Sequence, residues 1–202
     1  MFVEQALFTS AQTARGDGYQ LVARSRGIAE EDVRALTVWG PSHGSLRENV
    51  RGSGSCNYFV LPSGRHCVSR TVAAGAEYSR RGTRIATQFF LVPPEVFGRF
   101  ANSAFAMLKA AVADGLVRTN DESLRELASI TLTGRASLFD RAAVERARKL
   151  IGDAALAAAV QCALCEAGVM LRGVDAPEIV LAAVINCLPP DCRPQWSFST
   201  GL

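Results

Sequence analysis

The sequence is poor in lysine and histidine, and it has no long apolar run. Only Lys109 and Lys149 are lysines among its 22 basic residues. No apolar stretch reaches the roughly 20 residues that a membrane-spanning helix needs, because the alanine-rich stretch 154–164 is shorter and contains Gln161. The first residues lack the basic and apolar regions of a secretory signal peptide. These absences favour a cytoplasmic protein.

The sequence also lacks the motifs of several catalytic classes. It has no GxxxxGK[ST] or GxGxxG segment, which excludes the known nucleotide-hydrolysing loops of this kind. Cys162 and Cys165 form one CxxC, but no second pair at suitable spacing completes a zinc site. The CxxC falls near the end of a predicted helix, whereas a redox pair opens one. We therefore interpret both cysteines as core residues, and we expect no metal and no cofactor.

The two histidines offer little for nucleophilic catalysis. His66 and Cys67 are adjacent in a predicted strand, so their side chains point to opposite faces and cannot act as base and nucleophile together. His43 falls in a predicted loop with no evident carboxylate to orient it. The cysteines sit mostly in apolar runs, which predicts reduced, buried thiols and no disulfide framework. These residues favour a protein that is not an enzyme.

What is present suffices for a folded domain. With 202 residues, 49% of them hydrophobic and 20% charged, the chain can bury a core. In the first half, short apolar runs alternate with turn formers, which predicts a largely antiparallel sheet. A helix with apolar residues at Val33, Leu36 and Trp39 interrupts it. A long helix from 93 to about 114 is predicted to cover one face of the sheet. The expected strands lie at 5–10, 19–24, 57–61, 66–72 and 85–92.

The second half is predicted to be helical, with a βαβ unit at its end. Asp140 is expected to cap a helix that ends at Ile151, and a nearly all-apolar, buried helix follows at 153–167. Strand, helix and strand spacing over the last third predicts two parallel strands joined by a helix. The expected elements of this half are a strand at 127–132, the strands of the βαβ unit at 169–171 and 196–200, and its helix at 177–188.

The fold class is therefore α/β (α+β), with an antiparallel sheet, a helical segment and a C-terminal βαβ unit. We expect a single domain over 1–202, which would divide, if at all, into lobes at 1–115 and 116–202. The last residues alternate bulky and small polar side chains, as in a half-buried strand. Because the chain stops within this predicted strand, we expect it to be one domain of a longer protein.

The strongest polar feature is an arginine-rich segment. Residues 47–84 contain seven arginines and two glutamates, a local charge of +5 in a chain whose net charge is +3. The guanidinium group suits carboxylates and phosphates. An ordinary solvated basic loop is the competing interpretation, since surface charges contribute little to stability. The candidate residues for binding a partner or a phosphate are Arg65, Arg70, Arg80, Arg81, Arg84 and His43.

Several short stretches together carry a resemblance to a known family. They are EQALFTS at 4–10, GYQLVARS at 18–25 with GI at 27–28, VWGPS at 38–42, SRT at 69–71, RRG at 80–82, LPP at 188–190 and SFSTGL at 197–202. In this order they resemble the N-terminal domain (second type) of bacterial GTPase-associated proteins, over almost the whole chain. The resemblance implies a multidomain partner of small GTPases in signalling or conflict systems, and it brings no catalytic residues.

Three functions follow as hypotheses. The first, implied by the resemblance, is a non-catalytic adaptor domain that contacts a small GTPase or another domain of the same protein. The second is an enzyme or binding module for a phosphorylated small molecule held by the arginines. The third is a nucleic-acid-binding domain, for which stacking aromatics beside the arginines are scarce. The sequence predicts no membrane partner and leaves the oligomeric state open.

Overall fold

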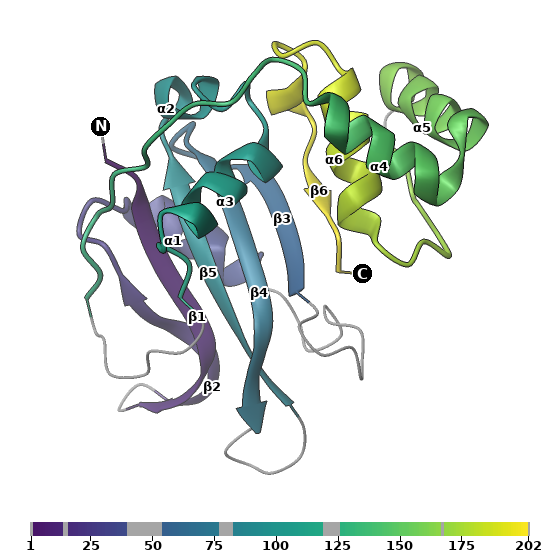
Figure 1. Cartoon of the computed structure of the whole chain (residues 1–202). Coiled ribbons are helices and arrows are strands. Elements are labelled where there is room, and N and C mark those ends of the chain that lie inside the picture. Colours follow the sequence, from purple (N-terminus) through teal and green to yellow (C-terminus); the bar gives the residue numbers. More distant parts are fainter. Residues whose placement is uncertain are drawn as a thin grey trace.

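A six-stranded antiparallel sheet forms the centre of the molecule (Figure 1). The computed structural model describes residues 2–13, 16–39, 54–76, 83–118, 126–166 and 168–201. Neighbouring strands follow the order β2-β1-β5-β4-β3-β6, and each strand pair is antiparallel. The α/β class and the antiparallel sheet are therefore confirmed. The strands are β1 (Glu4–Thr13), β2 (Gly16–Arg24), β3 (Gly54–Val60), β4 (His66–Ala76), β5 (Thr83–Val92) and β6 (Phe198–Ser199).

Strand β5 lies between β1 and β4 and is buried on both faces. Its residues from Ile85 to Val92 are all buried, as the apolar run in the sequence predicted. Phe89 and Leu91 pack toward helix α1 (Glu30–Val38), in one core with Leu36. Phe90 and Val92 point to the other face. The sheet therefore needs a cover on each side.

The second face is covered by two short helices instead of the single long helix expected. These are α2 (Pro94–Gly98) and α3 (Ala104–Ala113). Between them Ala101 and Asn102 adopt left-handed backbone angles, with φ of 55° and 53°. Asparagine tolerates this conformation. Ser103 then caps α3, because its side chain accepts a hydrogen bond from the Ala106 amide at 3.3 Å.

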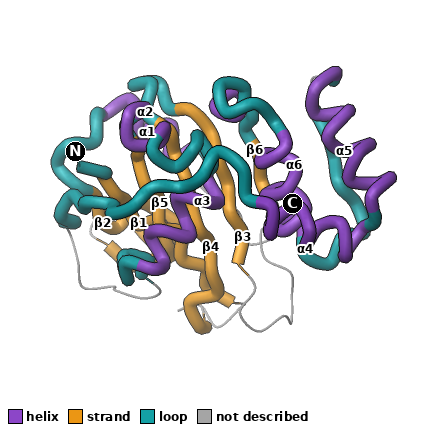
Figure 2. The backbone as a smooth tube through the Cα atoms, turned by 45° about the horizontal axis from the view of Figure 1, so that its top comes forward, coloured by secondary structure: helices purple, strands orange, loops and turns teal. Residues whose placement is uncertain are grey.

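Three further helices lie beside the β3 and β6 edge of the sheet (Figure 2). They are α4 (Arg141–Ile151), α5 (Asp153–Cys165) and α6 (Pro177–Cys187). Asp140 caps α4 as predicted, since its carboxylate accepts from the Ala143 amide at 3.1 Å. The buried Asn186 side chain of α6 bonds both the amide and the carbonyl of Asp140. These bonds fix the start of α4 against α6.

The expected C-terminal βαβ unit is not formed. Residues 168–172 make no strand, and β6 pairs antiparallel with β3 over two residues only. Residues 127–132 also form no strand. Instead, isolated bridges join Ile130 to Val3 and Glu126 to Arg24. An apolar run becomes a strand only where the edge of a neighbouring strand accepts its hydrogen bonds. The chain that follows α6 reaches the β3 edge and runs antiparallel to β3, so it forms no parallel pair.

Helix α5 is exposed, although its composition predicted burial. Among its thirteen residues only Leu156, Ala159 and Ala163 are buried. Cys162 and Cys165 are exposed, so their interpretation as core cysteines is wrong. No helix in the described ranges has the length and apolar character needed to cross a membrane.

Candidate functional site

The described arginines of the candidate set do not meet at one place. Arg65 follows the turn between β3 and β4, where its guanidinium donates to the Gly27 carbonyl at 2.9 Å. Arg84 lies at the start of β5, beside the other end of β4, and donates to the Ala74 carbonyl at 2.9 Å. Nine residues of extended chain, roughly 30 Å, separate positions 65 and 74. One small phosphate cannot bridge the two.

Arg70 lies between them, in the middle of β4. It pairs across the sheet with Cys56 of β3 and Gln88 of β5. Burial raises the pKa of the Cys56 thiol to about 12, against the opposing effect of the nearby Arg70 charge. Cys56 belongs to the core that lies under α2 and α3, so Arg70 is on the sheet face that these helices cover. Arg70 is therefore a half-buried residue of this face, between Cys56 and Gln88. His43, Arg80 and Arg81 lie outside the described residues, and their binding role stays a prediction.

The His66 imidazole belongs to a buried aromatic stack. It lies 4.3 Å from the Phe97 ring and 6.0 Å from the Tyr58 ring, centroid to centroid. Its Nδ1 is 2.9 Å from the Tyr58 hydroxyl, and burial lowers its pKa. Cys67 packs on the opposite face, in the core under α1. The prediction that His66 and Cys67 cannot act together is confirmed.

The Cys67 thiol is also unsuited to attack a substrate. It is fully buried, and its pKa is raised by burial first and by the nearby Asp32 carboxylate second. Metal chemistry has no evident site either: among the residues that the structure describes, no three His, Cys, Asp or Glu side chains come together to hold an ion.

A surface that the sequence interpretation missed lies at the end of α1. Trp39 has the helical spacing of an inward-facing residue, but it is the C-cap of α1 and is 65% exposed. Its indole lies 6.3 Å from the Phe59 ring of β3. Val38 beside it is 76% exposed. The sequence did contain a signal for this exposure, since Trp39 directly precedes Gly40-Pro41, a pair that commonly ends a helix. A residue at a helix end need not follow the apolar spacing of the helix.

Comparison with known proteins gives one match. The family model described as GTPase-associated protein 1, N-terminal domain type 2, matches residues 2–130. This range covers most of the sheet, α1, α2 and α3, and it ends before α4. No curated protein matches the chain, and no solved structure matches it.

Proposed function

We propose that this chain, which belongs to the family GTPase-associated protein 1, N-terminal domain type 2, is a non-catalytic interaction domain. Its partner in this proposal is a small GTPase or another domain of the same full-length protein. The family description supplies the link to a GTPase. The adaptor role, the bacterial signalling or conflict setting and the cytoplasmic location are our inference from the resemblance.

The exposed Trp39 at the end of α1, beside the half-buried Phe59 of β3, carries this proposal. The Trp39 ring lies beside that of Phe59, which restricts its rotation, and the residue is 65% exposed. Tryptophan is enriched among the few residues that dominate binding energy at protein interfaces. A pre-positioned side chain also loses little conformational entropy on binding. Both residues lie within the range that the family model matches.

A titration tests the proposal directly. The protein is mixed with the small GTPase encoded beside it, loaded with GDP or with a non-hydrolysable GTP analogue, and binding is followed by calorimetry. We expect a nucleotide-dependent complex with a micromolar or lower dissociation constant. Trp39→Ala should raise that constant about tenfold or more, whereas Val112→Ala, at an exposed apolar position of α3, should leave it unchanged. No nucleotide-dependent binding at high micromolar concentration would overturn the proposal.

The arginine-rich segment supplies a second element of the same proposal. We propose that Arg80 and Arg81, which lie outside the described residues, attract an acidic partner surface, as basic side chains do at interfaces. The double variant Arg80→Glu, Arg81→Glu should abolish binding and leave the melting temperature unchanged. Binding that survives this charge reversal would remove the arginines from the contact and leave the aromatic surface in place.

A further inference from the structure

The outer face of α5 is apolar and packs against nothing in the described part of the chain. Asp153 is the only charged residue within the helix. Four of its nine exposed positions are alanine, and the others include Gln161 and Leu164, which is 59% exposed. A helix that is apolar on all sides is normally buried on all sides. In Figures 1 and 2, α5 lies at the end of the molecule opposite β2. Exposed apolar surface of this kind marks an interaction site.

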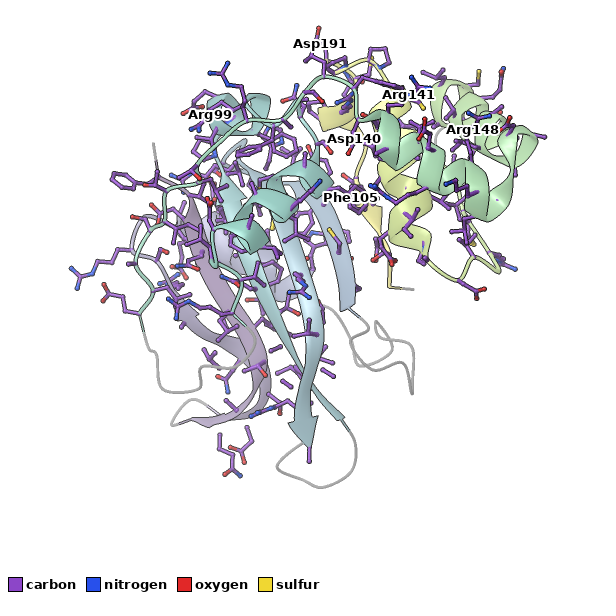
Figure 3. All side chains as sticks on the ribbon, viewed as in Figure 1. Arg99, Phe105, Asp140, Arg141, Arg148 and Asp191 are labelled. Atoms are coloured by element: carbon purple, nitrogen blue, oxygen red, sulfur yellow. The ribbon has the colours of Figure 1, made fainter. Side chains whose placement is uncertain are left out.

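An open groove borders this face, between α5 and residues of α4 and α6. Its volume is about 350 Å³, within the range of pockets that accept apolar groups. Arg148 of α4 reaches α5 at one end of the groove (Figure 3), where its guanidinium bonds the Asp153 carboxylate at 2.5 and 2.8 Å. The surface thus offers both a groove and, at its wall, the exposed side chain of Leu164. The apolar lining consists of Leu156, Ala157, Val160, Leu164 and Cys187.

We propose that α5 pairs antiparallel with α5 of a second copy of this chain, about a two-fold axis near Gln161. In such a pair Leu164 of each copy lies opposite Ala157 of the other, because the two positions are nearly equidistant from the axis. Leu164 then enters the groove of the other copy, and the contact repeats by symmetry. The alanine side chains permit close approach of the two helices, since interaxial distance depends on side-chain size at the contact.

The charges at the two ends of α5 fit this arrangement and select its direction. Arg146 and Lys149 are exposed on the last turns of α4, next to the start of α5, where Arg148 is already paired with Asp153. Glu166 is exposed just beyond the end of α5. An antiparallel pair places the basic end of each copy beside Glu166 of the other. A parallel pair would place like charges together, which is unfavourable.

This surface is separate from the one in the proposed function. Residues 153–166 lie outside the range 2–130 that the family model matches, whereas Trp39 and Phe59 lie within it. Self-association therefore stands or falls independently of GTPase binding. The middle of the α5 face carries no charge. Two copies of it can therefore pack together without a partner of opposite charge.

Sedimentation equilibrium over micromolar to millimolar concentrations tests the pairing. We expect a concentration-dependent dimer for the natural sequence. Leu164→Glu places a charge in the apolar contact of each copy and should raise the dimer dissociation constant about tenfold or more. Val112→Glu, at a comparably exposed apolar position on α3, is the matched control and should not change it. A thermal melt of each variant verifies that the fold is retained.

Crosslinking tests the register of the pair. In a chain carrying Cys162→Ser and Cys165→Ser, Gln161→Cys should give a disulfide-linked dimer on mild oxidation, because the axis brings the two copies of this position together. Ala142→Cys, exposed on α4, should give none. A monomer at all concentrations, or a dimer that Leu164→Glu does not weaken, would overturn the proposal. So would a monomeric protein in which Leu164→Glu impairs binding of the GTPase instead.

Discussion

The Tyr58 hydroxyl donates to the Pro194 carbonyl oxygen at 3.0 Å, across 136 residues of sequence. A tyrosine hydroxyl has one proton, so toward His66, 2.9 Å away at Nδ1, it accepts. His66 therefore carries a proton on Nδ1. The Tyr58 ring also stacks on Phe97 with centroids 5.3 Å apart. One side chain thus ties the β3–β4 hairpin, the covering helix α2 and the segment after α6 into one unit.

Removal of this hydroxyl should destabilise the protein. Tyr58→Phe keeps the ring stack and leaves the Pro194 carbonyl and the His66 Nδ1 donor without their partner. An unsatisfied buried polar group costs about 1–3 kcal/mol, so we expect a loss of that size in the free energy of unfolding, measured by urea denaturation. Val60→Ala, at an exposed position of the same strand, should cost much less. An unchanged midpoint for Tyr58→Phe would contradict the role given to the hydroxyl.

His66 should make stability depend on pH. Burial lowers its pKa below the ordinary value of 6.5, so below about pH 6.5 the unfolded chain takes up a proton more readily than the folded chain. The free energy of unfolding should therefore fall as the pH drops from about 7.5 to 5.5, by at most about 1.4 kcal/mol per pH unit. His66→Gln should flatten this dependence.

The other histidine of the sequence provides the control for this experiment. His43 is the only other histidine, so His43→Gln separates the two contributions. We expect the pH dependence of the His43→Gln variant to match that of the natural sequence. If His43→Gln removes the dependence and His66→Gln does not, the assignment to His66 is wrong.

Much of the secondary structure could be predicted because its signals are local. The β3–β4 hairpin surrounds a Pro-Ser-Gly turn, β5 is an apolar run, and Asp140 has the side chain of an N-cap. The break at Asn102 was missed because a continuous apolar stripe concealed a left-handed residue followed by a serine cap. Local patterns describe a segment well only where no tertiary contact overrides them.

The arrangement of the candidate site could be predicted less well, because it depends on which elements become neighbours. Arg65 and Arg84 are close in sequence, yet the length of β4 keeps them apart. The composition of α5 indicates an apolar helix but not how many of its faces find a partner. Trp39 has core-like spacing, and only its position at the helix end exposes it.

Arg193 should be among the residues most important for stability. Its side chain is 3% exposed, and it faces carbonyl oxygens only, including the last carbonyls of α6, where a helix end favours a cation. Its acceptors, at 2.8–3.0 Å, are the carbonyls of Ala101, Leu138, Asn186 and Leu188. Each hydrogen bond to a charged group contributes about 1.5–3 kcal/mol, so Arg193→Met should lower the free energy of unfolding by about 3 kcal/mol or more.

A lysine substitution distinguishes charge from geometry at this position. The ammonium group of Arg193→Lys keeps the charge but cannot span acceptors arranged around a planar guanidinium, so we expect most of the destabilisation to persist in urea denaturation. Arg146→Met, at an exposed position of α4, should change stability by less than about 0.5 kcal/mol. Full rescue by lysine would show that the charge alone matters there.

The cysteines should divide into fast and slow groups toward a thiol reagent, because burial controls both access and the thiolate fraction. Cys162 and Cys165 are exposed on α5, so both should react within minutes at pH 8 with a disulfide reagent such as Ellman's reagent. Cys56 and Cys67 are buried with raised pKa values, Cys56 to about 12, and should react only as the protein unfolds. Mass-spectrometric mapping of the modified sites checks the order. Cys162→Ser with Cys165→Ser should remove the fast phase and leave the slow one intact. Fast labelling of Cys67 in the folded protein would contradict the prediction, because it would show that the core beneath α1 opens far more readily than its packing implies.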